Sequence, residues 1–420
     1  MQTLPVLRRF GDAFAAPNGA AAPALAIPFL PYLEGLRGLA ALYVALYHVV
    51  LTLDGVRPGA SAVIPFSGAW LKWGHFAVAL FIVISGYVLA LPVVVRGSLS
   101  GGVRGFFMRR ARRLLPGYYA ALVLAMPFWI AQLHFTQDDA SPLRIIGNFI
   151  VHALLLHNVS QHTIQTIDGP LWSVAVECQI YLVFAFVLLP VVRRFGLGTM
   201  VALAFAIGLL PLAIGTLRHD SPRYALDDSC YWFIGIFALG SAAAYVAHGR
   251  DALFARLRER VPWRTVWAIA TVAFIALAYD RVVTEVPPWE FWQPDIALGV
   301  VAAVGFVILA TSPTGRLSSP TIAWLSSKPC VLLGTFSYSL YLIHFPILVT
   351  VMQTLSGTPL SNPQIVVLCY GVVIPAIVAL AYAFSLAFEK PFVSAYRRRA
   401  DESVAGRHHS TPLGTEAATR

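Results

Sequence analysis

The chain has 420 residues, of which 58% are hydrophobic and 12% are charged, and its mean hydropathy is +0.71. A soluble domain covers its surface with polar groups, so a composition this apolar excludes an ordinary soluble protein. The net charge of +10 alone would also suit a protein that binds nucleic acid. The placement of the basic residues argues against that class, because it follows the pattern of a membrane protein.

Apolar runs of about 20 residues recur along the whole chain, which is the length that a helix needs to cross a bilayer. The sequence therefore predicts an all-α fold, a polytopic transmembrane helical bundle of about ten spans. The expected spans are residues 34–53, 69–91, 115–133, 170–191, 199–217, 228–247, 264–281, 294–312, 332–352 and 365–387. A shorter apolar segment at 143–159 contains Asn148, His152 and His157, which favours a re-entrant or interfacial helix.

The basic residues predict the orientation of these spans. With the N-terminus inside, most of the 30 Lys and Arg residues fall in cytoplasmic segments. The expected outside loops hold Arg57, Arg144, Arg218, Arg223 and Arg281. This bias indicates a multi-pass protein of the cell inner (plasma) membrane with both termini in the cytoplasm.

Three parts are expected along the chain. Residues 1–29 are rich in Ala and Pro and predict a flexible cytoplasmic segment rather than a signal peptide. Residues 30–395 form the membrane domain, and residues 396–420 a disordered cytoplasmic tail. The four cysteines lie in or beside hydrophobic runs without metal-ligand spacing, so we expect buried thiols and no metal site.

The first span carries three ionisable residues, Glu34, Arg37 and His48. At about 100° per residue all three project from one helix face, and His48 lies about 16 Å deeper than Arg37. An imidazole at mid-membrane has to face the bundle interior and find a partner, which makes His48 a candidate general base. A structural, hydrogen-bonded histidine is the alternative. Arg37 could equally extend to the membrane surface and pair with Glu34.

A dense group of arginines, Arg109, Arg110, Arg112 and Arg113, precedes the third predicted span. One interpretation is that these arginines only hold the cytoplasmic end of the span in place, as the positive-inside rule describes. Arginine also binds phosphate in a bidentate manner, so a cytoplasmic nucleotide or pyrophosphate ligand would suit this group.

Further polar residues interrupt the later spans. Ser173, Glu177 and Tyr181 are spaced by four residues and predict a polar stripe beside Trp172, in which the acid needs a partner such as Arg37 or a bound hydroxyl. Elsewhere the spans hold Ser85, Ser337, Tyr338 and His344. Close helix packing explains the small and polar residues about as well as a ligand site does, except at His344.

These segments together resemble the acyltransferase-3 family of integral-membrane O-acyltransferases. The resemblance covers residues 30 to 395 and rests on five motifs in order: EGLR with a histidine after ten intervening residues (34–48), FIVISGYVL (81–89), RRARRLLPGYY (109–119), LWSVAVECQIYL (171–182) and SYSLYLIHFPI (337–347).

The resemblance implies transfer of an acyl group, usually acetyl, from cytoplasmic acyl-CoA to a hydroxyl of a carbohydrate or another small acceptor. It implies a catalytic His48, with Arg37 as its essential partner and Glu34 beside it. Arg109, Arg110 and Arg113 would bind the CoA phosphates, and Glu177 would belong to the functional set around the pore. Acyl-CoA would be a donor substrate, with no tightly bound cofactor.

Many family members carry a fused periplasmic hydrolase-like domain that is not recognised here, so a separate periplasmic partner is one expectation. The competing interpretation is a transporter or flippase of a lipid-linked or small polar substrate, which ten spans and buried ionisable residues would also suit. A receptor or scaffold is a third class, in which His48 would be dispensable.

Overall fold

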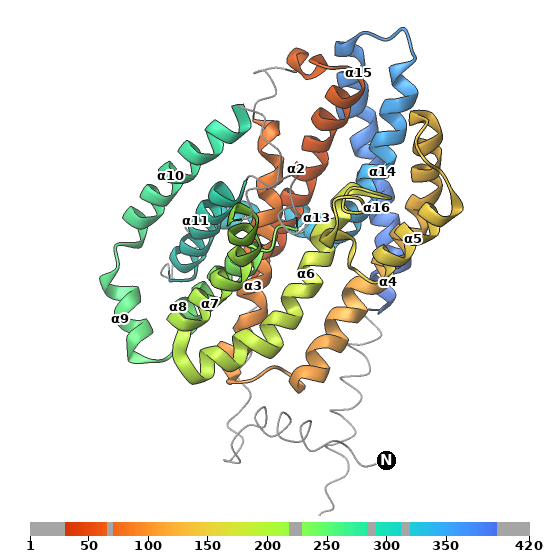
Figure 1. Cartoon of the computed structure of the whole chain (residues 1–420). Helices are drawn as coiled ribbons and strands as arrows, with labels where there is room; N and C mark the ends of the chain where they lie inside the picture. The colour runs from red at the N-terminus through yellow and green to blue at the C-terminus, as the bar shows by residue number, and fades with distance from the viewer. Residues whose placement is uncertain (1–29, 65–69, 218–228, 284–290, 312–319, 393–420) are drawn as a thin grey trace, which may run out of the picture.

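The computed structural model describes residues 30–64, 70–217, 229–283, 291–311 and 320–392 (Figure 1). The predicted flexible segments at 1–29 and 396–420 lie outside these residues. Every regular element in the described ranges is helical, so the predicted all-α membrane bundle is confirmed.

The first half of the chain forms long helices joined by short connections. Its elements are α2 (Pro31–Val56), η1 (Ala60–Val63), η3 (Leu71–His75), α3 (Phe76–Arg96), α4 (Gly102–Thr136), α5 (Pro142–Ala153), η4 (His157–Val159), η5 (Gly169–Leu171), α6 (Trp172–Val183), η6 (Phe184–Leu188) and α7 (Leu189–Leu217). Helices α6 and α7 run on through the π-helical turn η6, and Gly196 then breaks the helical backbone with a φ of 87°.

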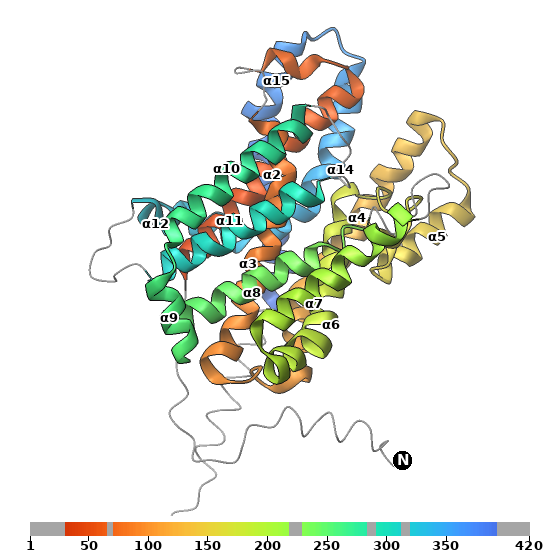
Figure 2. The same ribbon diagram turned by 60° about the vertical axis from the view of Figure 1, so that its left-hand side comes forward.

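The second half of the chain is also helical and contains more short helices. Its elements are α8 (Phe233–His248), α9 (Ala252–Arg260), α10 (Trp263–Val283), α11 (Trp292–Thr311), α12 (Pro320–Leu325), α13 (Lys328–Thr335), α14 (Ser337–Ser356), α15 (Asn362–Leu368), η8 (Cys369–Val373) and α16 (Ile374–Phe388). Helix α9 connects α8 and α10 at the lower left flank of the bundle (Figures 1 and 2).

Each predicted span corresponds to a helix or a helical run in this structure. Eight described stretches are long and apolar enough to cross a membrane, and α8 is a shorter apolar helix. The stretch at Gly169–Ile214 covers two predicted spans, which meet at the break at Gly196. The segment at 143–159 holds most of the 12-residue helix α5, about 18 Å long, and the single 3-10 turn η4, so neither helix is long enough to cross.

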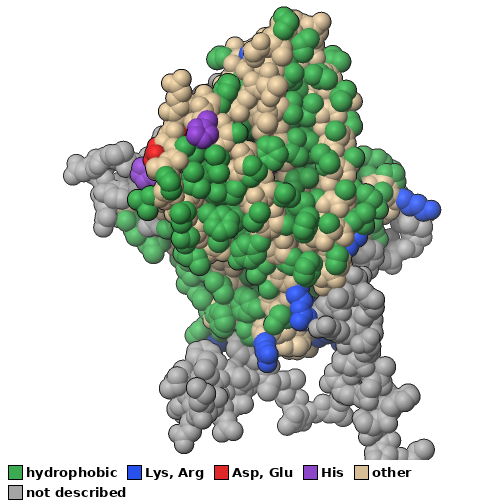
Figure 3. Space-filling model, turned by 90° about the vertical axis from the view of Figure 1, so that its right-hand side faces the viewer, with side chains coloured by type: hydrophobic (Ala, Val, Ile, Leu, Met, Phe, Trp, Pro, Cys, Tyr) green, Lys and Arg blue, Asp and Glu red, His purple; other side chains and the backbone are tan. Residues whose placement is uncertain are grey.

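The surface agrees with a bilayer environment. Figure 3 shows a face covered largely by hydrophobic side chains, with Lys and Arg seen mainly towards its lower end. Exposed apolar residues lie on helices far apart in the sequence, including Val123 on α4, Val272 on α10 and Val367 on α15. Such a belt would be unstable in water and is the expected boundary with lipid.

Helices α3 and α8 cross at very close range. A Cβ atom built on Gly86 would lie 2.0 Å from the Phe237 carbonyl oxygen, and one built on Gly240 would lie 2.1 Å from the Val83 carbonyl oxygen. The Ser241 hydroxyl donates to the Gly86 carbonyl across the same crossing, at 3.2 Å. Two glycines therefore bring the backbones together, as small residues do in membrane helix pairs.

Arg57, at the end of α2, fastens that helix to the loop between α14 and α15. Its guanidinium donates to the carbonyl oxygens of Leu355, Ser356, Thr358 and Leu360 at 2.7 to 3.2 Å. These carbonyls lie at the C-terminal end of α14 and just beyond it, where a helix runs out of i+4 donors, so one cation bonds several of them at once. The C-terminal ends of α2 and α14 are thus fixed to each other.

Candidate active site

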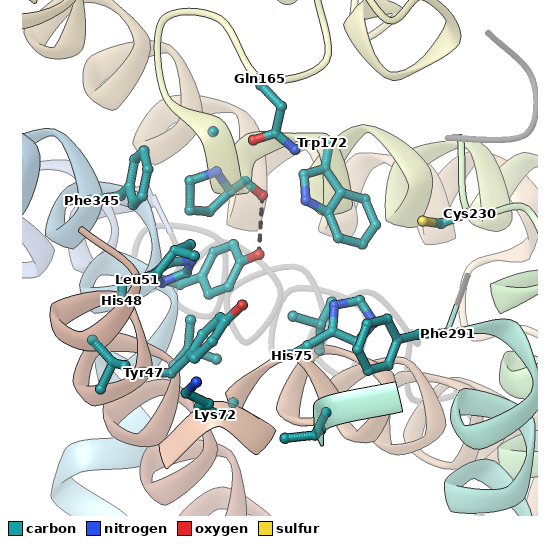
Figure 4. A pocket seen from close by; sticks show the side chains of 18 of the residues that line it. Tyr47, His48, Leu51, Lys72, His75, Gln165, Trp172, Cys230, Phe291 and Phe345 are labelled. Carbon is teal, nitrogen blue, oxygen red and sulfur yellow. Dashed lines mark hydrogen bonds between the residues drawn. The ribbon is translucent and has the colours of Figure 1, made fainter. Parts of the chain in front are cut away.

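A cavity of about 540 Å³ lies in the half of the bundle that contains the C-terminal end of α2 (Figure 4). Its walls come from α2, η3 and α3, the 164–172 segment, α10, α11 and α14. Under the predicted orientation this is the outer half of the protein. The labelled side chains around it include His48, His75, Gln165 and Trp172 (Figure 4).

His48 forms a hydrogen-bonded pair with His344, which joins α2 to α14. The His48 Nδ1 and His344 Nε2 atoms are 2.8 Å apart. His344 Nδ1 lies 2.8 Å from the Tyr341 carbonyl oxygen and 3.1 Å from that of Leu340, so this nitrogen has to carry a proton. In the neutral ring His344 Nε2 is then an acceptor, and His48 Nδ1 donates to it.

The reactive nitrogen of His48 follows from this tautomer. With its proton on Nδ1, the neutral His48 ring keeps a lone pair on Nε2. His48 lines the cavity, and His344 is fully buried behind it. An oriented imidazole with one free lone pair can remove a proton from a hydroxyl or attack a carbonyl carbon.

Tyr341 and the 168–173 segment form the neighbouring wall. The Tyr341 hydroxyl lies 3.0 Å from the Pro170 carbonyl oxygen and 2.7 Å from the Ser173 hydroxyl. Asp168 precedes this wall and is buried, with no hydrogen-bond partner for its carboxylate among the described residues. Burial raises the pKa of the Asp168 carboxyl, which favours its neutral form beside the cavity.

A second polar cluster surrounds Glu177, deeper along α6. Glu177 Oε1 accepts from the Ser85 hydroxyl at 2.7 Å and from the Tyr181 hydroxyl at 2.5 Å. Arg110 lies next to Tyr181, within electrostatic range of Glu177, and its Nε has no partner among the described residues. The half-buried acid thus has two protein hydroxyls as partners, with a cation nearby.

Arg37 lies at the edge of this cluster, at the opposite end of α2 from the cavity. Its guanidinium is 3.7 Å from Glu34, and Arg113 and Glu177 lie within electrostatic range. Eleven residues separate Arg37 from His48, which is about 16 Å along the axis. One helix therefore connects the cationic cluster near its N-terminal end with the imidazole that lines the cavity.

The arginines of the RRxRR motif lie inside α4, which begins at Gly102 and not near residue 115. Met, Ala and Arg all favour helix, so the helix extends out of the apolar run into the basic segment. Arg113 lies near Arg37, and Arg110 lies near Arg113 and Glu177, whereas no described contact places Arg109 in this cluster.

Other predicted site residues form bonds elsewhere. The Ser337 hydroxyl donates to the Gly334 carbonyl at 2.9 Å, at the break between α13 and α14. The Tyr338 hydroxyl donates to the Leu114 carbonyl at 3.1 Å and ties α14 to α4. Neither residue lines the described cavity, whereas Trp172 does and Ser173 reaches it through Tyr341.

Several polar residues that the cavity brings together were not predicted from the sequence. His75, Lys72, Gln165 and Tyr341 line it, and the buried Asp295 lies behind His75. Asp295 had a usable signal, since it is an acid in the first turn of a predicted span. Among the described residues, no three His, Cys, Asp or Glu side chains are grouped to hold a metal ion.

The chain was compared with known proteins. It is 27% identical over 355 residues to the peptidoglycan O-acetyltransferase OatA of Listeria monocytogenes, covering 79% of this chain and 51% of that protein. It is 27% identical to the putative peptidoglycan O-acetyltransferase YrhL of Bacillus subtilis, covering 86% and 55%. It is 23% identical to the O-acetyltransferase OatA of Staphylococcus aureus, covering 77% and 51%.

The chain thus spans about half the length of these curated relatives. No solved structure matches it significantly. The profile of the acyltransferase domain family matches residues 30–385, which is nearly the whole helical bundle. The chain therefore belongs to the acyltransferase-3 family of membrane enzymes.

Proposed function

We propose that this enzyme transfers an acyl group, with acetyl favoured, from acyl-CoA to a hydroxyl of a carbohydrate acceptor. The observation that carries the proposal is the tautomer of His48. The hydrogen bond to His344 leaves the lone pair of His48 on Nε2, and His48 lines a cavity of about 540 Å³. A thioester and an alcohol react without metal or redox chemistry, and they need such a base or nucleophile.

In this proposal, acyl-CoA reaches the site from the cytoplasmic side. Coenzyme A carries its phosphates at one end and its thiol on a long, thin arm at the other. Arg37, Arg110 and Arg113 gather at the inner end of α2, where they would hold the phosphates. The arm would then lead the thioester along α2 towards His48, about 16 Å away.

The acceptor enters from the outer half. Trp172, Tyr47 and Phe291 offer aromatic faces for sugar rings, and Gln165 offers an amide at the rim (Figure 4). Two of the relatives are named as peptidoglycan O-acetyltransferases, so cell-wall glycan is the first acceptor to try. A separate periplasmic protein that receives or delivers the acyl group belongs to the same proposal.

His48 can serve in either of two ways. As a general base, Nε2 takes the proton of the acceptor hydroxyl while its oxygen attacks the thioester carbon and the C–S bond breaks. As a nucleophile, Nε2 attacks the thioester, releases the thiolate and carries the acyl group to the acceptor. Both routes end with one ester, one CoA thiolate and one proton.

The test uses purified protein in nanodiscs with acetyl-CoA, with and without an extract of cell-surface glycans. Free thiol and acetylated glycan are measured together. Glycan-dependent release of thiol with matching acetylation supports the proposal. Thiol release without acetylated product contradicts the proposal and indicates thioester hydrolysis. No release with any donor and extract contradicts it and favours the transporter.

Neutralising the arginines is expected to weaken donor binding. The triple change of Arg109, Arg110 and Arg113 to Gln should raise the Kd for acetyl-CoA by tenfold or more, about 1.4 kcal/mol. The wild-type affinity should fall with added salt, and the variant should lose most of that dependence. Titration of acetyl-CoA at two ionic strengths measures both effects.

The matched control changes Arg256 and Arg260 to Gln, because both are exposed on α9 and also belong to the predicted cytoplasmic side. Equal affinities of the wild type, the control and the triple variant for acetyl-CoA would show that the arginine cluster does not bind the donor and only sets the orientation of the helix in the membrane.

A further inference from the structure

A second histidine in the cavity, His75, is held by a buried carboxylate. His75 Nε2 and Asp295 Oδ2 are 3.2 Å apart, and the indole Nε1 of Trp232 donates to the same oxygen at 3.0 Å. Asp295 is 0% exposed and His75 is 7% exposed. The group joins η3, α8 and α11, which are distant in sequence.

The hydrogen bonds fix the tautomer of His75. Asp295 Oδ2 already accepts from the indole Nε1 of Trp232, so it acts as an acceptor towards His75 as well, and Nε2 of His75 carries the proton that it donates. In the neutral ring the lone pair is then on Nδ1. Among the described residues no side chain or backbone group bonds that nitrogen, and the ring lines the cavity. An imidazole oriented by a buried aspartate is the usual arrangement of a general base.

His48 and His75 therefore present lone pairs to one cavity and come from different helices. Figure 4 shows the two rings on different sides of it, with His75 near Phe291. A purely structural tie between α8 and α11 would need only Trp232 and Asp295. The third member, His75, is an ionisable ring in the cavity wall.

We propose that His75 is a second catalytic residue, the base that takes the proton of the acceptor hydroxyl. This inference rests on the proposed acyl transfer and assigns His48 to the donor. His48 Nε2 attacks the thioester carbon, the C–S bond breaks, the thiolate leaves, and the Nδ1 proton passes to His344.

In the second half His75 Nδ1 takes the proton of the acceptor hydroxyl as its oxygen attacks the acyl carbon. The C–N bond to His48 breaks, His344 returns its proton, and His75 releases the captured proton to water. The sum is acyl-CoA plus alcohol giving ester, thiolate and one proton, so no further reactant is required.

The experiment separates the two halves. His75→Gln keeps an amide that can donate to Asp295 but removes the basic nitrogen. We expect glycan-dependent transfer to fall by at least about 100-fold, the usual contribution of a general base. The KM for acetyl-CoA and the acetyl-loading of His48 without acceptor, followed by mass spectrometry after rapid quenching, should stay as in the wild type.

Two further variants test the orientation. Asp295→Asn can donate to Nε2 and drive the ring proton onto Nδ1, so transfer should fall comparably. Trp232→Phe removes one donor from the same carboxylate without altering the tautomer, so its transfer rate should stay within a few-fold of the wild type. Transfer at the wild-type rate in His75→Gln would overturn the assignment. The assignment would also be overturned if acetyl-loading of His48 and transfer to the glycan fell together in His75→Gln. A lowered melting temperature with an unchanged kcat would overturn it as well.

A readout independent of turnover distinguishes failure of this inference from failure of the proposed function. Diethyl pyrocarbonate modifies unprotonated imidazole, and His162, exposed in the loop, serves as the internal control. An N-acetylglucosamine tetramer or the glycan extract should protect His75 but not His162, whereas acetyl-CoA should protect neither. Protection of His75 in a protein that transfers nothing contradicts acyl transfer but keeps the acceptor contact. Transfer without glycan protection of His75 contradicts this inference alone.

Discussion

Replacing His48 with Ala is expected to abolish acyl transfer while the protein stays folded in the membrane. Whether its Nε2 acts as base or as nucleophile, no other described nitrogen occupies the same place between His344 and the cavity. We expect the rate of glycan acetylation to fall by a factor on the order of 10⁴ or more, because the chemistry itself loses its reacting group. Thiol release and acetylated glycan measure this loss.

The partner and a control refine this result. His344→Phe leaves His48 in place but removes the acceptor of its Nδ1 proton, so a smaller loss, on the order of 10²-fold, is expected. His134→Ala changes an exposed histidine near the end of α4 and should leave the rate unchanged. Wild-type transfer by His48→Ala would rule out the catalytic assignment of His48.

The crossing of α3 and α8 should tolerate no added side-chain atom. Gly86→Ala places a Cβ atom 2.0 Å from the Phe237 carbonyl oxygen, and a backbone oxygen cannot rotate away. The two helices have to separate, which costs at least the roughly 1–3 kcal/mol of ordinary overpacking. We expect a low yield of monodisperse protein in detergent and a melting temperature lower by several degrees.

Gly371→Ala is the matched control for this change. Gly371 lies in the exposed π-helical turn η8, and a Cβ atom there meets nothing within 4 Å. Alanine generally favours helix over glycine, so this variant should melt at or above the wild-type temperature. Equal melting temperatures for the two alanine variants would show that α3 and α8 can separate without cost.

Much of the fold could be predicted because it depends on local composition. Apolar length alone placed a helix at each predicted span, and the bilayer rule for ionisable groups singled out His48 and Glu177. The start of α4 was placed about 13 residues too late, because hydropathy marks where the apolar run begins and not where the helix begins. The roles of the site residues remain predictions.

The pairings inside the site could not be predicted, because they arise from contacts between distant helices. His48 meets His344 across 296 positions and His75 meets Asp295 across 220, with no spacing rule to connect them. The hydroxyls that satisfy Glu177 come from Ser85 on α3 and from Tyr181 one turn away on α6. Only the second of these partners could be read from helical periodicity.

The clamp made by Arg57 has a mechanical consequence. It holds α2 and α14 together at one end, and the bond between His48 and His344 holds them again further along. Two attachments along one contact prevent the helices from sliding or rocking past each other. Helices α2 and α14 should therefore move as one rigid unit and not open or close relative to each other during turnover. A covalent cross-link between α2 and α14 should therefore leave turnover intact, whereas a transporter that alternates its access by shifting these helices would stop.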